Sequence, residues 1–143
     1  MAALDVEEVR RLLPHRYPFL MIDRVLERSD ERVVAIKNVT INEPFFQGHF
    51  REPLDAVMPG VLILEAMAQT AAFLALAPEG GDPEMGYLVG IEKARFRRKV
   101  VPGDRLRLEA KLARRKGELL RADVTARVDD EEAASATLSI VLP

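Results

Sequence analysis

Glu65 is the residue that most directly suggests chemistry, because it is a carboxylate inside a long apolar segment. Residues 61–77 are mostly Val, Leu, Ile, Ala and Met, interrupted by Glu65, Gln69 and Thr70. A buried carboxyl group is rarely left without a partner or a role, and burial raises its pKa, as a general acid near neutral pH requires. The alternative is a polar seam in which Glu65 contacts Gln69, one helical turn later.

The two histidines lie in segments of different character. His49 belongs to residues 42–58, a stretch without a hydrophobic period that also contains Gly48. Long loops inside compact domains are usually functional, and histidine titrates near neutral pH, so His49 is a candidate general base. The alternative is a packing residue held between Phe45–Phe46 and Phe50. His15 lies where a helix gives way to a strand, and we interpret it as structural.

Two further features could bind charge. Pro59-Gly60 opens the apolar segment, and free N–H groups at such a helix start attract developing negative charge; the alternative is an ordinary helix start with proline in its first turn. Residues 93–99 (KARFRRK) hold five cations in seven positions. Strand alternation would place Lys93, Arg95, Arg97 and Lys99 on one side, to dock an acidic partner or a phosphate, or simply to face solvent.

Composition limits the classes of protein that this chain can be. Its 143 residues are 48% hydrophobic, and 21 Lys+Arg oppose 23 Asp+Glu, a net charge of −2. The length fits one domain over residues 1–143, and the charge lacks the basic surplus of nucleic-acid-binding proteins. The absence of cysteine excludes disulfides, thiolate nucleophiles and Cys-containing metal sites.

The sequence shows no sign of export or membrane insertion. Its first residues are acidic, whereas a signal peptide begins basic and continues apolar. The apolar segment 61–77 is shorter than the roughly 20 residues of a spanning helix, and polar residues interrupt it. We therefore expect a soluble cytoplasmic protein.

Hydrophobic periods predict the elements that must position these side chains. Helices are expected over residues 5–13, where Asp5 and Glu8 can form a capping box, and from Gly60 to Ala77. Strands are expected at residues 19–27, 32–41, 106–112, 120–128 and 134–140, with a further strand or two within 87–100. The economical architecture is α+β, with a curved antiparallel sheet wrapped around one buried helix. A sheet covers that helix on one side only, so a second subunit is expected to cover more.

Several motifs, in order, resemble those of the FabZ-type β-hydroxyacyl-acyl-carrier-protein dehydratases. The resemblance rests on residues 12–20 (LLPHRYPFL), 48–50 (GHF), 58–69 (MPGVLILEAMAQ), 90–96 (GIEKARF) and 101–104 (VPGD). It implies a hot-dog fold, in which an antiparallel sheet wraps a long central helix. By position, His49 matches the family's catalytic histidine and Glu65 its catalytic carboxylate.

The resemblance also implies a reaction and partners. The reaction is loss of water from a (3R)-3-hydroxyacyl thioester on acyl carrier protein, giving the trans-2-enoyl thioester in fatty acid elongation, without metal or redox cofactor. The backbone N–H of Gly60, together with that of Val61, would hold the thioester oxygen. Each site would combine the histidine of one protomer with the carboxylate of another, in a dimer or a trimer of dimers. Acidic acyl carrier protein would dock on Arg95, Arg97 and Lys99.

The sequence departs from the family pattern at two places, and the motifs leave room for rival functions. Residues 51–57 (REPLDAV), between the two candidate catalytic groups, are about two residues longer than in the family and lack its Pro-Gly pair. Lys99 stands where the family often has proline, and Leu88 where it often has phenylalanine, at the acyl tunnel. A dehydratase that also isomerises the double bond typically has Asp in place of Glu65. A hot-dog thioesterase and a non-catalytic acyl-binding or regulatory module are alternative functions for the same fold. The sequence does not determine which acyl chain length the protein prefers.

Overall fold

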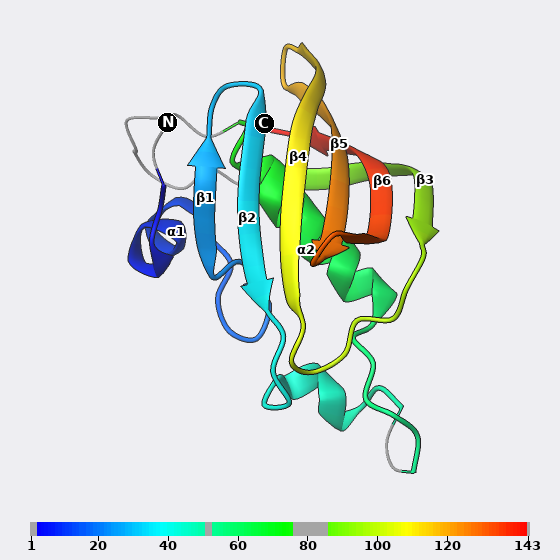
Figure 1. Cartoon of the computed structure of the whole chain (residues 1–143). Helices are drawn as coiled ribbons and strands as arrows, with labels where there is room; N and C mark the ends of the chain where they lie inside the picture. The colour runs from blue at the N-terminus through cyan, green and yellow to red at the C-terminus, as the bar shows by residue number, and fades with distance from the viewer. Residues whose placement is uncertain (1–2, 51–52, 76–85, 143) are drawn as a thin grey trace.

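Six antiparallel strands form one sheet that curves around a central helix (Figure 1). The computed structural model describes residues 3–50, 53–75 and 86–142. The strand order is β1-β2-β4-β5-β6-β3, and the helix is α2 (Gly60–Ala72). The strands are β1 (Arg24–Arg28), β2 (Arg32–Asn38), β3 (Tyr87–Phe96), β4 (Arg105–Lys116), β5 (Leu119–Val128) and β6 (Glu131–Val141). This arrangement confirms the expected α+β hot-dog fold.

Alternation along β4, β5 and β6 produces the buried face that covers α2. The inward side chains are apolar and buried; they are Leu106, Leu108, Ala110, Leu120, Ala122, Val124, Ala126, Ala134, Ala136, Leu138 and Ile140. α2 contacts β2, β4, β5 and β6. Its buried alanines, Ala66, Ala68 and Ala71, carry small side chains that let the helix backbone approach the sheet closely.

Two short helices flank the sheet. α1 (Val6–Leu12) lies beside β1 and has the expected capping box: the Asp5 carboxylate accepts from the Glu8 N–H at 2.9 Å, and the Asp5 N–H donates to Glu8 Oε1 at 3.3 Å. The 3₁₀ helix η1 (Pro44–Gln47) lies in the loop between β2 and α2, below the sheet in Figure 1. Over the described residues 42–50 and 53–58, the predicted loop is thus confirmed apart from this single turn; residues 51 and 52 lie outside the described residues.

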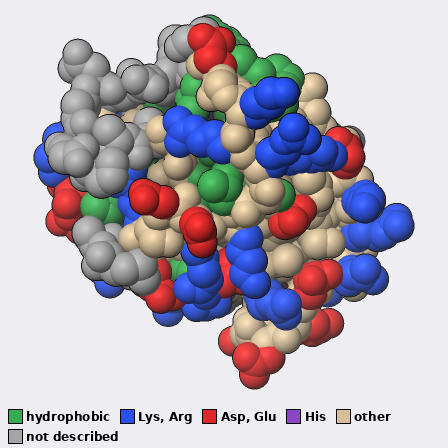
Figure 2. All heavy atoms as spheres, turned by 90° about the horizontal axis from the view of Figure 1, so that it is seen from above, with side chains coloured by type: hydrophobic (Ala, Val, Ile, Leu, Met, Phe, Trp, Pro, Cys, Tyr) green, Lys and Arg blue, Asp and Glu red, His purple; other side chains and the backbone are tan. Residues whose placement is uncertain are grey.

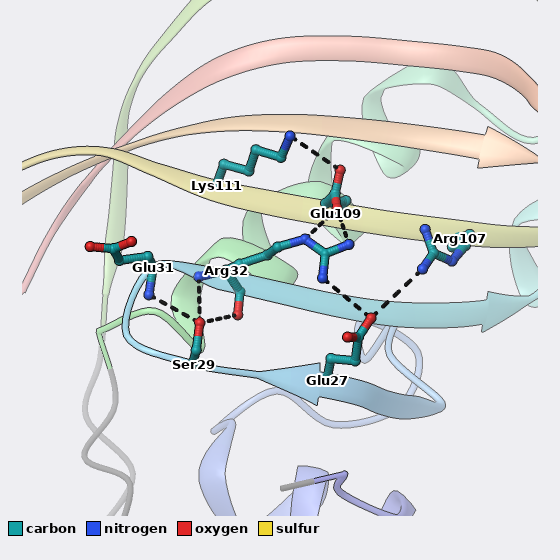
Figure 3. Close-up of polar contacts among 7 residues, drawn as sticks. All are labelled: Glu27, Ser29, Glu31, Arg32, Arg107, Glu109 and Lys111. Carbon is teal, nitrogen blue, oxygen red and sulfur yellow. Dashed lines mark hydrogen bonds and ion pairs between the residues drawn. The ribbon is translucent and has the colours of Figure 1, made fainter. Parts of the chain in front are cut away.

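The face of the sheet turned away from α2 carries ion pairs that join three strands (Figure 3). Arg32 on β2 pairs with Glu109 on β4 and with Glu27 on β1, and Glu27 also lies 3.8 Å from Arg107. The hydrogen bond to Glu109 is the main reason why the pKa of the Arg32 guanidinium lies above its usual value. Exposed pairs of this kind each contribute less than about 1 kcal/mol, so burial of the inner face sets the strand register.

The strand expected over residues 19–27 is shorter than predicted and begins at Arg24. Its first part bonds to a helix side chain instead of a neighbouring strand: the Phe19 carbonyl accepts from Gln69 Nε2 at 2.7 Å, and the Met21 N–H donates to Gln69 Oε1 at 2.8 Å. The strand expected over 32–41 likewise ends at Asn38. Long-range side-chain hydrogen bonds are therefore the reason why the pattern overestimated the first strand.

The central helix ends earlier than the sequence predicted. It stops at Ala72, and the Phe73 N–H bonds to the Thr70 carbonyl at 3.2 Å in a tighter turn; residues 76 and 77 lie outside the described residues. Arg28 Nε donates to the Phe73 carbonyl at 3.2 Å, and burial lowers the pKa of this guanidinium. A cation at the last carbonyls favours a helix end at this position.

Candidate active site

The loop that carries His49 is anchored to the sheet by a buried lysine. Lys37 on β2 is 6% exposed, and its Nζ lies 3.1 Å from both carboxylate oxygens of Glu43, the residue before η1. Glu43 also accepts from the Thr40 N–H at 3.1 Å. One turn further on, the His49 N–H bonds to the Phe45 carbonyl at 3.2 Å. A charged pair on the sheet thus fixes the start of the loop that positions His49.

The imidazole of His49 is held so that one ring nitrogen remains available. Nδ1 lies 2.7 Å from the Val57 carbonyl oxygen, so we assign the proton to Nδ1 and the lone pair to Nε2. The ring stacks on Phe50 with a centroid distance of 4.1 Å. Phe50 itself has a φ of 57°, a left-handed conformation that is uncommon for an aromatic residue and is found most often at functional sites. The ring is therefore held with Nδ1 on the Val57 carbonyl, and Nε2 is the nitrogen with the lone pair.

His49 lines a hollow of about 500 Å³ together with the first residue of α2. The hollow is lined by His49, Phe50, Val57, Met58, Gly60, Ile63, Phe96, Arg97, Arg98, Lys99 and Val100. The N–H groups of Leu62 and Ile63 bond to the Pro59 carbonyl at 3.0 and 3.1 Å, whereas within the described residues those of Gly60 and Val61 have no acceptor. Gly60 therefore brings a free donor to the histidine's hollow. The Val61 side chain is 72% exposed and does not line it.

Phe96 is a residue of this hollow that the sequence did not single out as part of the site. A Cβ placed on Gly60 would lie 3.1 Å from Cε1 of the Phe96 ring, so the ring packs directly on the helix start. Glycine at position 60 permits this approach, because any larger residue would place a Cβ against the ring. The signal in the sequence was weak, because Phe96 is one aromatic residue inside a run of cations.

Glu65 lies in a different and smaller pocket, of about 100 Å³, that is lined mainly by apolar side chains. Gln69 Nε2 donates to Glu65 Oε2 at 2.7 Å, so the expected polar seam between these two residues is present. His15 lines the same pocket, and its Nε2 lies 3.5 Å from Glu65 Oε2. The structure thus places His15, which the sequence pattern marked as structural, next to the candidate catalytic carboxylate.

Within one chain, the structure does not bring His49 and Glu65 together. Glu65 comes five residues after Gly60, which is about 7.5 Å further along the helix axis and on another side of the helix. The two side chains accordingly line separate pockets.

The predicted basic face is rearranged by a bulge in β3. The strand register shifts between Glu92 and Arg95, Lys93 has a φ of 54°, and the strand ends at Phe96. The expected alternation of cations through Lys99 on one side of a strand is therefore wrong. β3 ends at Phe96, so Arg97, Arg98 and Lys99 lie in the loop that follows it. In that loop the strand alternation no longer determines which way each side chain points.

The structure gives the four cations from Arg95 onward different roles. Arg97 donates to Glu132 at 2.8 Å, and Arg98 lies 3.1 Å from Glu131 and 3.5 Å from Asp104. In the described part of the chain, Arg95 and Lys99 form no ion pair. Arg97, Arg98 and Lys99 border the His49 hollow, whereas Arg95 remains on β3. The opposite end of the molecule, seen from above in Figure 2, has basic and acidic side chains interspersed.

Two other expectations concern ligands and membranes. Among the residues that the structure describes, no group of three or more His, Cys, Asp and Glu side chains could hold a metal ion. No helix in those ranges is long and apolar enough to cross a membrane. The expectation that no cofactor is needed stays a prediction.

The FabA-like domain family matches residues 13–137, and the chain belongs to this family. It is 50% identical over 139 residues to the 3-hydroxyacyl-[acyl-carrier-protein] dehydratase FabZ of Streptococcus mutans, covering 97% of this chain and 98% of that protein. It is 51% identical over 136 residues to the FabZ of Streptococcus pyogenes, covering 95% and 96% of the two chains.

Solved structures with the same fold are more distant in sequence. The dehydratase heterocomplex ApeI:P from Xenorhabdus doucetiae matches with a TM-score of 0.80 at 19% identity, over 94% of this chain and 90% of that chain. A sigma28-regulated virulence protein from Campylobacter jejuni matches with a TM-score of 0.71 at 18% identity, over 97% and 90%. At these identities the likeness establishes the fold alone.

Proposed function

We propose that this chain dehydrates (3R)-3-hydroxyacyl thioesters carried on acyl carrier protein to trans-2-enoyl thioesters, as one step of fatty acid elongation. The observation that carries the proposal is the identity of about half of all residues, over nearly the whole chain, with proteins named as FabZ dehydratases. The geometry agrees with this chemistry, because a histidine with a free Nε2 and a free helix N–H border the same hollow.

The reaction divides between three groups. His49 Nε2 takes the proton from C2 of the substrate, while the Gly60 N–H, with that of Val61 beside it, stabilises the negative charge that develops on the thioester oxygen. The C2=C3 double bond forms as the C3–O bond breaks, and the hydroxyl leaves as water with a proton from Glu65, given either directly or through a water that Glu65 holds. The cycle closes when the proton on His49 returns to Glu65 through solvent.

This division of labour requires a site shared between two chains. His49 and Glu65 line separate pockets in one chain, so the carboxylate that works with one histidine comes from a partner. β3 supports the assembly, because it is an edge strand with exposed apolar side chains; these are Tyr87, Leu88, Val89, Ile91 and Phe96. An exposed apolar edge strand favours pairing with a second copy. A homodimer is therefore the smallest active unit, and a trimer of dimers fits equally.

The docking surface for the carrier consists of Arg95 on β3, Lys99 at the border of the His49 hollow and, to a lesser degree, Arg97. Arg95 and Lys99 have no ion pair in the described residues, so their charge is free to attract an acidic carrier protein. Arg97 contributes less than the sequence suggested, because Glu132 already holds it. The cytoplasmic location expected from the sequence stays a prediction.

A hydration assay tests the proposed reaction directly. The purified protein is mixed with a crotonyl thioester, and loss of the enoyl absorbance is followed while the products are separated. A dehydratase converts the enoyl thioester to the 3-hydroxyacyl thioester in this direction. Release of a free thiol would instead indicate a thioesterase, and binding without turnover would indicate a non-catalytic acyl-binding module.

A further inference from the structure

The imidazole of His15 is placed against Glu65 by an unusually well-anchored segment. Arg16, the next residue, donates three hydrogen bonds to backbone carbonyls: to Leu13 at 2.9 Å, to His15 at 2.7 Å and to Arg10 at 2.8 Å. These bonds fasten the segment to the end of α1. The backbone that carries His15 is thus held by the side chain of Arg16.

The two nitrogens of this ring have different surroundings. Nε2 lies 3.5 Å from Glu65 Oε2, while Nδ1 is buried and has no hydrogen-bond partner among the described residues. A buried N–H without an acceptor costs more than an unused lone pair, so we assign the proton to Nε2. The ring nitrogen that carries the proton is therefore the one that lies nearer the carboxylate. At 3.5 Å the contact is longer than an ordinary hydrogen bond.

The two oxygens of Glu65 are correspondingly unequal. Oε2 accepts from Gln69 Nε2 at 2.7 Å and has His15 Nε2 at 3.5 Å, whereas within the described residues no hydrogen bond reaches Oε1. Two donors on one oxygen fix the rotation of a carboxyl group and leave the other oxygen to face the pocket. A ring held only for stability would be expected to satisfy both of its nitrogens.

We propose that His15 is a positioning residue for Glu65, which together with Gln69 holds Oε2 so that Oε1 meets the leaving hydroxyl. This role rests on the proposed dehydratase function and assigns His15 no contact with substrate. His15 therefore contributes to the rate only in the step in which Glu65 takes part. Loss of His15 therefore lowers kcat and leaves KM nearly unchanged, because the pocket keeps its shape and only the carboxylate loses its orientation.

Three substitutions separate this role from a purely structural one. His15→Leu removes the N–H and retains bulk, and we expect kcat to fall roughly tenfold with KM within about twofold. His15→Gln carries an amide N–H to a similar position, and we expect kcat within about threefold of the unchanged protein. His15→Asn is too short to reach Glu65 and should behave like the leucine variant, which it replaces if that variant does not fold. Tyr17→Leu, at an 81% exposed position of the same segment, is the matched control.

A double-mutant cycle decides through which group His15 acts. Each His15 substitution is repeated in a Glu65→Gln background, and crotonyl-thioester hydration is measured at high enzyme concentration, with thermal melting as the check of folding. If His15 acts through Glu65, the tenfold loss disappears in that background. An equal loss in both backgrounds, or no loss of kcat in His15→Leu and His15→Asn, would overturn the proposal. If Glu65→Gln is inactive while the His15 variants are fully active, the positioning role of His15 is wrong and the proposed function stands. If Glu65→Gln is itself fully active, the proposed catalytic role of Glu65 is wrong as well.

Discussion

Gln69 holds the carboxylate of Glu65 through a hydrogen bond of 2.7 Å from its Nε2 to Oε2, one helical turn away on α2. The same amide donates to the Phe19 carbonyl and accepts from the Met21 N–H. One buried side chain therefore links the central helix, the segment before β1 and the candidate catalytic carboxylate. The polar seam and the catalytic role of Glu65, which the sequence presented as alternatives, are compatible in this geometry.

Replacing Gln69 should affect stability and activity together. Gln69 is 1% exposed, so Gln69→Leu would leave the Met21 N–H buried without its partner. We expect the free energy of unfolding to fall by roughly 2–4 kcal/mol and kcat to fall with it. Urea denaturation measures the first effect, with Gln47→Leu at an exposed position as the control. A change below about 0.5 kcal/mol would contradict the linking role of this side chain.

The two candidate catalytic residues should each be essential. We expect His49→Ala and Glu65→Gln to lower turnover by roughly 100-fold or more, which is the usual contribution of a general acid or base. Turnover is measured by crotonyl-thioester hydration, and thermal melting shows that each variant is folded. Near-normal turnover in a folded His49→Ala protein would reject the assignment of the base.

A shared site predicts that two inactive variants restore activity when they are mixed. In a mixed dimer of His49→Ala and Glu65→Gln chains, one site carries both lesions and the other carries none. With random pairing and independent sites, activity should return to at most about a quarter of the unmodified level. Mass labelling confirms that subunits exchange. If exchange is complete and the mixture stays inactive, both groups come from the same chain.

Charge reversal at the proposed docking surface should affect only carrier-linked substrate. We expect the double variant Arg95→Glu, Lys99→Glu to raise the KM for a substrate on acyl carrier protein, and to leave the KM for a small thioester analogue almost unchanged. The difference should shrink with added salt, because exposed charges are screened over about 10 Å at 0.1 M. Arg115→Glu, near the β4–β5 hairpin at the other end of the sheet from η1, is the control (Figure 1). Equal effects on both substrates would show that these cations do not recognise the carrier.

The contact between Gly60 and Phe96 predicts a steric effect that can be reversed. Gly60→Ala places a Cβ 3.1 Å from the Phe96 ring, so either the ring or the helix start must shift by a few tenths of an ångström. We expect kcat/KM to fall roughly tenfold, because small displacements at a reacting centre are costly. Phe96→Leu in the same chain should recover much of the loss. Full activity of Gly60→Ala alone would show that the ring does not limit access to the helix start.

The sequence by itself determined most of the fold and the chemistry-bearing residue types. Alternation over residues 106–140 specified three strands with one buried face, since a side-chain period of two leaves a single way to bury the apolar set. The Asp5–Glu8 box placed the first helix, because its hydrogen bonds are local. Glu65 was conspicuous because a charge within an apolar helix requires an explanation.

Tertiary structure alone decided what surrounds those residues. The Gln69 bonds to Phe19 and Met21, and the approach of His15 to Glu65, join residues about 50 positions apart, and no local period records such pairs. The bulge at Lys93 likewise depends on how β3 pairs with β6. The apolar residues that become buried recur at short, regular intervals in the sequence, so their burial can be predicted from the sequence. The direction of a polar side chain depends instead on which partner the folded chain places within about 3 Å of it.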